Sequence, residues 1–389
     1  MPDAIVLVGL SGSGKSTVSA AVAERLGRPF IDLDQDIADR LGAHPSEIIE
    51  TRGEAAFRAE EAAAVILAAG VDGAVIATGA GAVIDPLNRW ALWDAGLVAW
   101  LDAPDEVLLS RLAAHDETRP LLVGDAAARL ATQRARRERF YRAADVRIDA
   151  AAPSEAVIEA VIGEATAGVP AARRLFDAEV RRDHLMGPRT ARVVLGMELD
   201  GPTYEDVIAP TSTGTPVVVA DRRAAAKLPD LMAALPSDRR IDIQSGERQK
   251  RLRTVDRLLE AASAMGAERG DAWVGVGGGV TTDMVGAAAA LYVRGVNFVA
   301  VTTTWLGMTD AAIGGKVAVD LSGAKNAAGA FWPPAAIVGD VATQRTLPRS
   351  RRLDGMAVSL KSGVIGDPAL WDLIETRGKA ALRDVEAAR

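Results

Sequence analysis

The segment Gly9-Leu10-Ser11-Gly12-Ser13-Gly14-Lys15-Ser16 constrains the fold more than any other part of the sequence. It follows a short apolar run at residues 5–8 and precedes residues 16–26, which have the pattern of an amphipathic helix. In that context a glycine-rich loop wraps its backbone N–H groups around phosphate oxygens, and the helix dipole adds attraction. The pattern places Lys15 at the β- and γ-phosphates and Ser16 on Mg²⁺. ATP contacts are predicted for Gly12, Ser13, Gly14, Lys15, Ser16 and Thr17.

The chain has 389 residues, which is more than one hydrophobic core usually holds, so two domains are expected. Short β-branched runs alternate with helical stretches, a pattern that predicts an α/β fold with a parallel sheet and helices on both faces. Expected strands are residues 5–8, 30–33, 74–77 and 97–101, then 191–195, 216–220, 272–276 and 298–301. Small residues with Gly and Pro mark a linker at 169–174, which separates a domain at 1–168 from a second α/β domain at 175–389.

Composition excludes several classes of protein. The formal charge of −7 disfavours binding to nucleic acid, and the absence of cysteine excludes disulfides and thiolate metal sites. The amino terminus has no basic region of the kind found in signal peptides. The most apolar later stretch, residues 284–301, contains Arg294 and glycines, so we expect a helix and a strand rather than a membrane span. A cytoplasmic protein without membrane or nucleic-acid partners is the simplest interpretation.

Two carboxylates, Asp32 and Asp34, follow the apolar residues Phe30 and Ile31. On a strand, residues two apart point to the same face, and the carboxyl ends of parallel strands form the usual ligand-binding edge. We therefore expect both side chains on one strand, with one near Mg²⁺ and the other near the substrate. Taken alone, a pair of solvated acids would be the more common explanation.

Residues 3–165 resemble shikimate kinase in the order and spacing of several segments. Besides the phosphate loop these are Phe30-Ile31-Asp32-Leu33-Asp34, Gly53-Glu54-Ala55-Ala56-Phe57-Arg58, Thr78-Gly79-Ala80-Gly81-Ala82-Val83, Thr118-Arg119-Pro120-Leu121-Leu122, and Arg137 four residues before Tyr141. The resemblance implies the reaction ATP + shikimate → ADP + shikimate 3-phosphate.

Site roles follow from that resemblance. Asp34, Arg58 and Arg137 would bind shikimate, with Asp34 also orienting or deprotonating the attacking hydroxyl. Arg119 would lie in a lid at 114–124 and, with Lys15, stabilise the transferring phosphoryl group. Asp32 would help Ser16 to hold Mg²⁺, and Glu61, three residues after Arg58 on one helix, would hold its guanidinium. The substrate loop would comprise Gly79, Ala80 and Gly81.

One departure concerns that loop, because the family usually has three consecutive glycines and this chain has Ala80 in the middle. A Cβ there would weaken substrate binding if the position needs a positive φ. For most of the arginines around Arg137 we expect a solvated basic helix. The alternative for this half is another small-molecule kinase with a phosphate loop, such as a gluconate or nucleotide kinase. No Asn-Lys-x-Asp segment points to a GTPase.

Residues 175 to about 370 resemble the amino-terminal part of 3-dehydroquinate synthase. The shared segments are Ser245-Gly246-Glu247-Arg248-Gln249-Lys250, Gly277-Gly278-Gly279-Val280-Thr281-Thr282-Asp283, Tyr292-Val293-Arg294-Gly295, Thr302-Thr303-Thr304, Asp310, Gly314-Gly315-Lys316, Gly323-Ala324-Lys325-Asn326, Gly329-Ala330-Phe331 and Leu347-Pro348. The resemblance implies NAD at the glycine turn and a homodimer in which Arg294 acts across the interface. The implied NAD and substrate site comprises Glu247, Lys250, Gly277, Gly278, Gly279, Asp283, Thr303, Asp310, Lys316, Lys325, Asn326 and Lys361.

The same family needs a divalent metal held by one Glu and two His, and here this chain departs from it. Val358 stands where the Glu is expected, and His44, His115 and His184 all precede that region. We find no zinc site and expect a truncated domain with doubtful synthase activity. Three explanations stay open: a remnant that binds NAD or only associates with a partner, a broken gene, or a second chain that supplies the rest. Glycerol-dehydrogenase-like enzymes are the alternative family.

Overall fold

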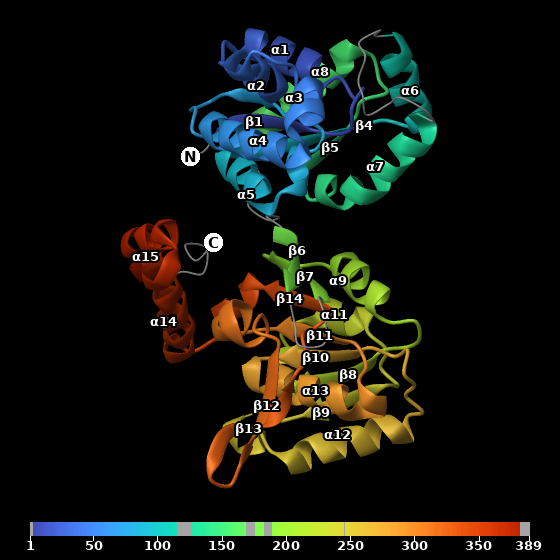
Figure 1. Ribbon diagram of the computed structural model, residues 1–389, viewed down its shortest axis with the longest axis vertical. Coiled ribbons are helices and arrows are strands. Elements are labelled where there is room, and N and C mark those ends of the chain that lie inside the picture. The colour runs from blue at the N-terminus through green and yellow to red at the C-terminus, as the bar shows by residue number, and fades with distance from the viewer. Residues whose placement is uncertain (1–2, 115–125, 169–175, 183–188, 245, 382–389) are drawn as a thin grey trace. The chain divides into compact units, whose positions relative to one another are not determined.

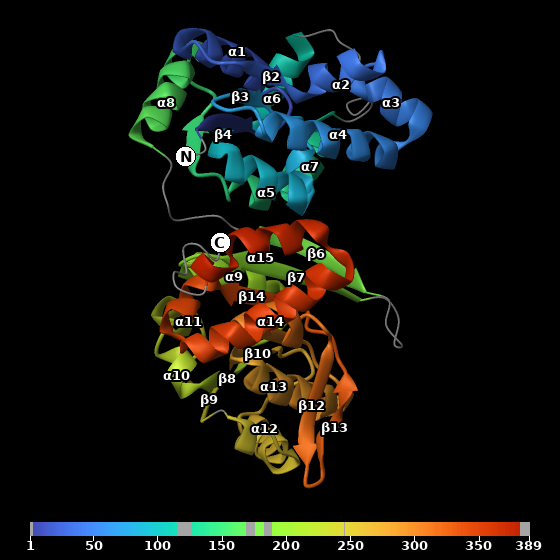
Figure 2. The ribbon, with the colours of Figure 1, turned by 90° about the vertical axis from the view of Figure 1, so that its left-hand side faces the viewer.

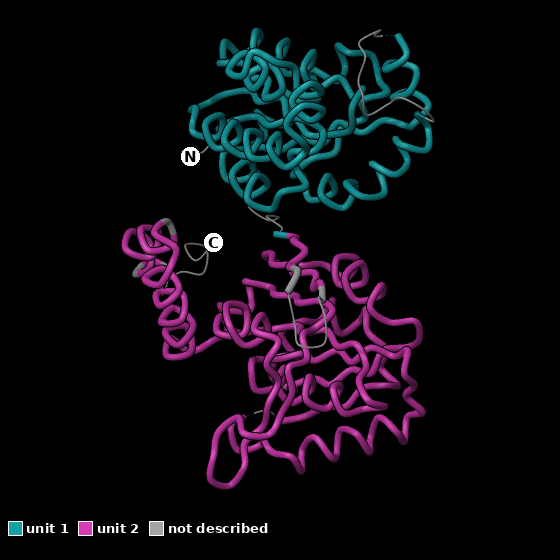
Figure 3. The backbone as a smooth tube through the Cα atoms, viewed as in Figure 1, with its two compact units in different colours: residues 1–176 teal, residues 177–389 magenta. Residues whose placement is uncertain are grey.

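The computed structural model describes residues 3–114, 126–168, 176–182, 189–244 and 246–381. The chain divides into two compact units, residues 1–176 and residues 177–389, which Figure 3 distinguishes by colour. Each unit is described by itself. The predicted linker at 169–174 lies outside the described residues.

The first unit is built on a five-stranded sheet of order β2-β3-β1-β4-β5, in which every neighbouring pair is parallel. All five residues of the central strand β1 are buried, as expected of a strand covered on both faces. The predicted strands are confirmed with ends shifted by at most one residue, and β5 was not predicted. The strands are β1 (Ala4–Val8), β2 (Phe30–Asp32), β3 (Val75–Ala77), β4 (Gly96–Asp102) and β5 (Val146–Asp149).

Helices cover both faces of this sheet, with α1 and α8 on one side and α5 on the other (Figures 1 and 2). This arrangement brings the carboxyl ends of the parallel strands to one edge, where β1 leads into the phosphate loop and β3 into Gly79. The helices are α1 (Lys15–Leu26), α2 (Leu33–Leu41), α3 (Pro45–Arg52), α4 (Glu54–Ala69), α5 (Pro86–Ala95), α6 (Asp105–Ala114), α7 (Ala126–Tyr141) and α8 (Ser154–Ala167).

The expectation that Asp32 and Asp34 share a strand is wrong. Strand β2 ends at Asp32, and Asp34 lies in the first turn of α2. The reason is local, because Oδ1 of Asp32 accepts hydrogen bonds from the backbone N–H groups of Asp34 at 3.1 Å and Gln35 at 3.3 Å. An aspartate at this position caps a helix, so its side chain ends the strand and starts α2.

The second unit contains a seven-stranded sheet of order β6-β7-β14-β11-β10-β8-β9 and a separate antiparallel hairpin, β12-β13. All four predicted strands are present, as β7, β8, β10 and β11. The strands are β6 (Phe176–Arg182), β7 (Arg189–Gly196), β8 (Val217–Asp221), β9 (Arg240–Ile243), β10 (Trp273–Gly277), β11 (Phe298–Thr302), β12 (Lys316–Leu321), β13 (Ala324–Phe331) and β14 (Ala336–Asp340).

The apolar stretch at 284–301 divides into a helix and a strand, as predicted, and helix α13 packs along β10 and β11. Within the described ranges, no helix has the length and apolar content needed to cross a membrane. Helices α14 and α15 pack against each other at the end of the described chain (Figure 2). The helices are α9 (Gly201–Ile208), α10 (Arg222–Ala225), α11 (Pro229–Ala234), α12 (Leu252–Ala264), α13 (Gly279–Leu291), α14 (Arg349–Gly366) and α15 (Pro368–Ala381).

Candidate active site

The phosphate loop has the backbone geometry that its sequence requires. Gly12 has φ 85° and Gly14 has φ 89°, both in the left-handed region that glycine adopts at little cost. Lys15 begins α1, is buried, and donates from Nζ to the carbonyl oxygens of Gly9 at 2.9 Å and Leu10 at 3.0 Å. The ammonium group is therefore folded back over the loop that it would share with phosphate.

Side chains around the loop suit an anionic ligand. The hydroxyl of Ser13 is buried and has no hydrogen-bond partner among the described residues, a state that a phosphate oxygen would relieve. Ser16 and Thr17 are exposed in the first turn of α1, where the helix N-terminus attracts negative charge. The residues present thus fit a nucleotide phosphate.

Helix α4 carries the first of the two arginines that are predicted to bind the substrate. Arg58 donates to Oε2 of Glu61 at 2.7 Å and to Oε1 of Glu54 at 3.1 Å, so the expected support from Glu61 is present. The Glu61 side chain is only 2% exposed. Burial raises the pKa of Glu61, and the Arg58 charge opposes that rise.

The loop after β3 lies against Arg58 and Asp34. A Cβ built on Gly79 would lie 2.8 Å from Oδ1 of Asp34, and one on Gly81 would lie 2.3 Å from Nη1 of Arg58. Ala80 does not adopt a positive φ, so the expected penalty for alanine at that position does not arise. A Cβ at either flanking glycine would therefore displace Asp34 or Arg58 from its present position, whereas the middle position accepts a Cβ.

Helix α7 supplies the second basic side chain, Arg137, which is buried. Burial lowers the pKa of Arg137; Tyr141 opposes this effect, and the nearby charge of Arg58 adds to it. The structure thus brings Asp34, Arg58, Arg137 and the Gly79 loop together. It also adds Tyr141, whose hydroxyl donates to the Ala80 carbonyl oxygen at 2.6 Å. The only sequence signal for Tyr141 was its i,i+4 spacing from Arg137.

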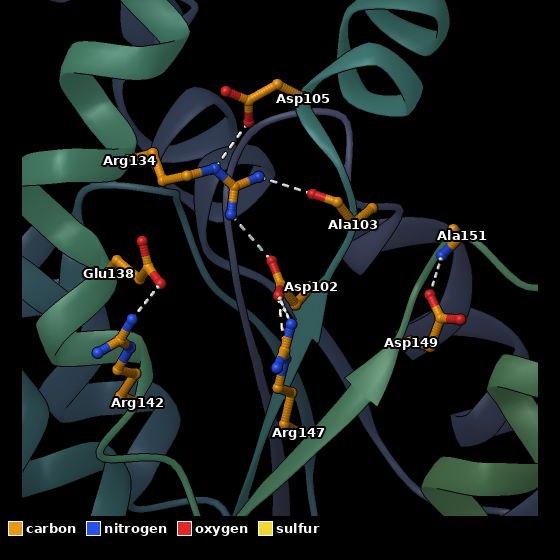
Figure 4. A network of polar contacts seen from close by, with 9 residues as sticks. All are labelled: Asp102, Ala103, Asp105, Arg134, Glu138, Arg142, Arg147, Asp149 and Ala151. Carbon is orange, nitrogen blue, oxygen red and sulfur yellow. Dashed lines mark hydrogen bonds and ion pairs between the residues drawn. The ribbon is translucent and has the colours of Figure 1, made fainter. Parts of the chain in front are cut away.

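The expectation of a solvated basic helix is wrong for Arg134. Its guanidinium donates to Asp105 at 2.7 Å, to Asp102 at 3.0 Å and to the carbonyl oxygen of Ala103 at 2.6 Å (Figure 4). Asp102, at the carboxyl end of β4, also accepts from Arg147. This network ties α7 to the sheet edge beside the phosphate loop. Arg119, predicted for the lid, lies outside the described residues.

The glycine turn of the second unit connects β10 to α13. A Cβ on Gly277 would lie 2.5 Å from Oγ1 of Thr281, and one on Gly278 would lie 2.9 Å from Cγ2 of Thr304. The Thr281 hydroxyl is buried and has no hydrogen-bond partner in the described part of the chain. A glycine-lined turn at the start of a helix, with an unpaired hydroxyl beside it, fits the pyrophosphate of a dinucleotide.

Beside this turn a cavity of about 520 Å³ collects several predicted residues, namely Asp283, Asp310, Lys316 and Asn326. Nζ of Lys250 reaches Oδ2 of Asp283 at 2.5 Å and Oδ1 of Asn326 at 2.6 Å. Burial raises the pKa of Asp283 to about 6, although Lys250 acts to lower it.

Four other predicted residues of the second unit do not line this cavity. Lys325 pairs with Glu247 at 2.8 Å, with both side chains more than half exposed. Lys361 lies exposed on α14. Thr303 is buried, and its carbonyl accepts a hydrogen bond from the Thr343 hydroxyl.

Within the described ranges, no group of three or more His, Asp or Glu side chains is placed to hold a metal ion. Val358, the residue at the position of the expected Glu ligand, is half-buried on α14. Its hydrocarbon side chain offers no atom for a metal.

The fold and the loop geometry define the class: a kinase with a phosphate loop, followed by a second α/β unit of dinucleotide-binding type. The shikimate kinase family profile matches residues 11–166, and the profile of the 3-dehydroquinate synthase N-terminal region matches residues 240–354. A bifunctional shikimate kinase/3-dehydroquinate synthase of Thermotoga maritima is 31% identical over 361 residues, which cover 93% of this chain and 67% of that protein. The chain belongs to this family of shikimate kinases fused to a 3-dehydroquinate synthase domain.

Two other comparisons cover one half each. The 3-dehydroquinate synthase of Mycobacterium leprae is 46% identical over 143 residues, which span 37% of this chain and 40% of that protein. The structure of shikimate kinase from Acinetobacter baumannii in complex with shikimate covers 42% of this chain and 90% of that one, at 34% identity and a TM-score of 0.39. The family profile thus assigns the first unit to the shikimate kinases. The matched part of this chain spans 40% of the M. leprae synthase and 52% of the synthases of Nocardia farcinica and Rhodococcus opacus.

Proposed function

We propose that the first unit transfers the γ-phosphoryl group of ATP to a hydroxyl of shikimate, giving shikimate 3-phosphate for aromatic amino-acid biosynthesis. The observation that supports this proposal is the proximity of two guanidinium groups beside the Gly79 loop, half-buried Arg58 and buried Arg137. A ligand with negative charge would stabilise two such groups side by side in addition to Glu61, and a carboxylate can accept two parallel N–H bonds from an arginine.

The other residues then have distinct roles. Asp34, which is exposed beside Gly79, orients the attacking hydroxyl and accepts its proton. Lys15 and, in the lid, Arg119 stabilise negative charge on the transferring group. Ser16 and Asp32 would hold Mg²⁺, which neutralises phosphate charge when it is bound. The position of Lys15 and Ser16 at the start of α1, directly after the phosphate loop, supports their roles, and the role of Arg119 rests on the family resemblance.

The test is release of ADP by the full chain on addition of shikimate. Arg58→Ala should raise the shikimate KM by about a hundredfold, while Arg142→Ala, on an exposed side chain, should leave it within about twofold. Activity that ignores shikimate and responds to gluconate or to a nucleotide would reject the assignment.

For the second unit we propose NAD binding at the Gly277-Gly278-Gly279 turn, supported by the glycine cradle and the buried Thr281 hydroxyl. Titration of the full chain with NAD should saturate in the micromolar range, and Gly278→Val should abolish the binding because its side chain would clash with Thr304. Absence of binding together with clear dimerisation would favour the alternative, a unit that only associates.

Two finer proposals accompany this one. We expect the synthase reaction itself to be absent or very slow, because Val358 offers no ligand for the polarising metal. We expect a homodimer formed through the second unit, with Arg294 at the interface. Arg294 is exposed, and its backbone has a φ of 65°. Analytical ultracentrifugation of Arg294→Ala beside the unaltered chain checks the dimer, and an assay with NAD and a divalent metal checks the synthase. The cell fraction in which the chain occurs checks the expected cytoplasmic location.

A further inference from the structure

We infer that Tyr141 is a positioning residue for the shikimate site, acting through the Gly79-Ala80-Gly81 loop, which it joins to the helix that carries Arg137. This inference rests on the proposed kinase function. Its starting point is the hydrogen bond from the Tyr141 hydroxyl to the carbonyl oxygen of Ala80 at 2.6 Å, which joins α7 to a loop 61 residues earlier. In the sequence, Tyr141 is distinguished only by its spacing from Arg137 and has no assigned role.

Side chains of α5 hydrogen-bond to the backbone carbonyl groups that directly follow the substrate loop. Nδ2 of Asn88 donates to the carbonyl oxygen of Ala82 at 3.2 Å, and Nη1 of Arg89 donates to that of Ile84 at 3.0 Å. Those two bonds fix the turn that follows the loop. The Tyr141 bond is made at the residue between the two glycines, which lie against Asp34 and Arg58. Tyr141 therefore controls the part of the loop that the substrate would meet.

The Tyr141 hydroxyl is itself held in place. Its ring is 1% exposed and stacks on Trp100 with 6.0 Å between ring centroids and 21° between the planes. A buried ring stacked in this way has little freedom to move toward or away from the loop. Burial also raises the pKa of Tyr141 above its usual range, so the hydroxyl keeps its proton.

Tyr141 also shares one face of α7 with Arg137, which lies one helical turn earlier and is buried. Nη1 of Arg137 donates to Oε1 of Gln133, one turn earlier still, at 3.0 Å. The hydrogen bond from Tyr141 therefore joins the substrate loop to the helix that carries Arg137.

Tyr141→Phe tests this inference, because it removes one oxygen and keeps the stacked ring. Loss of the bond leaves the Ala80 carbonyl without its phenol partner and loosens the pocket before substrate binds. We expect the shikimate KM to rise about tenfold, with the ATP KM unchanged and kcat within about twofold. Tyr204→Phe is a matched control, since Tyr204 is also 1% exposed but lies in the second unit and its hydroxyl has no partner among the described residues.

Calorimetric titration with shikimate should show the same tenfold loss in Kd, and thermal unfolding of both variants shows whether the fold is kept. An unchanged shikimate KM in Tyr141→Phe, beside an active unaltered chain, would overturn the inference. So would an equal fall in kcat and in the affinities for both substrates, which would indicate general loosening. An unaltered chain that releases no ADP with shikimate would instead reject the proposed function, and this inference with it.

Discussion

Nη1 of Arg58 lies 2.7 Å from Oε2 of Glu61, and the carboxylate in this pair is almost completely buried while the guanidinium faces the substrate loop. Because Glu61 is the buried partner, it orients Arg58: it holds the planar guanidinium in the orientation that a bound carboxylate needs. Glu54, the other partner, is 64% exposed and so offers a much weaker constraint.

This asymmetry predicts different effects for two otherwise similar substitutions. Glu61→Gln should raise the shikimate KM by about tenfold, because the neutral amide holds the guanidinium less firmly. Glu54→Gln should change it by less than about twofold. Steady-state kinetics with both substrates varied gives the comparison, and equal effects from the two variants would contradict it.

A second prediction concerns the substrate loop. Gly81→Ala should raise the shikimate KM by about tenfold or more, because the added Cβ would displace the Arg58 guanidinium, which is the end of a flexible side chain. Stability should change little, since that side chain can move. Ala80→Gly is the control, and it should bring no gain in affinity because Ala80 is not strained. A clear gain from Ala80→Gly would show that the present alanine weakens binding.

The ion pair of Lys250 and Asp283 predicts a titration in the second unit. Asp283 should lose its proton at about pH 6, which is above the ordinary range for an aspartate because the group is buried. Carbon-detected NMR on aspartate-labelled protein measures the midpoint. Lys250→Met should raise it further, since the cation that favours the charged form is then absent. A midpoint near 4 in the unaltered chain would contradict the prediction.

The raised pKa of Asp283 also sets the direction in which the free energy of unfolding changes with pH. The folded protein holds this proton more tightly than the unfolded chain, so the contribution of Asp283 is fully present below the unfolded pKa of about 3.9 and is lost as pH rises through about 6. The free energy of unfolding of the unaltered chain should therefore fall over that window by more than that of Asp283→Asn. Urea unfolding at several pH values tests this difference.

The Arg134 network predicts an effect on stability. Arg134→Met should lower the free energy of unfolding of the first unit by about 2 kcal/mol, because partly buried Asp102 loses a charged hydrogen-bond donor. Arg142→Met, at a side chain 68% exposed, should cost less than about 0.5 kcal/mol. Chemical unfolding followed by fluorescence distinguishes the two, and similar costs would show that the network adds nothing.

Much of the fold could be predicted because its signals are local. The β-branched runs gave strands of the two sheets, and the i,i+3 spacing of Arg58 and Glu61 gave their ion pair. The wrong predictions have two kinds of cause: contacts between residues far apart in the sequence, and local signals that compete with each other. Asp34 was misplaced because the capping ability of Asp32 outweighed the strand pattern. The burial of Arg134 depends on Asp102, 32 residues earlier, and no spacing rule connects residues on different elements.

The glycine loop after β3 has a consequence for how such sequences diversify. A Cβ at either glycine would displace Asp34 or Arg58, while the middle residue is held through its carbonyl oxygen, which every amino acid carries. A search that demands three glycines would pass over chains like this one. A library that varies residue 80 alone would explore substrate preference without touching the groups that hold the substrate.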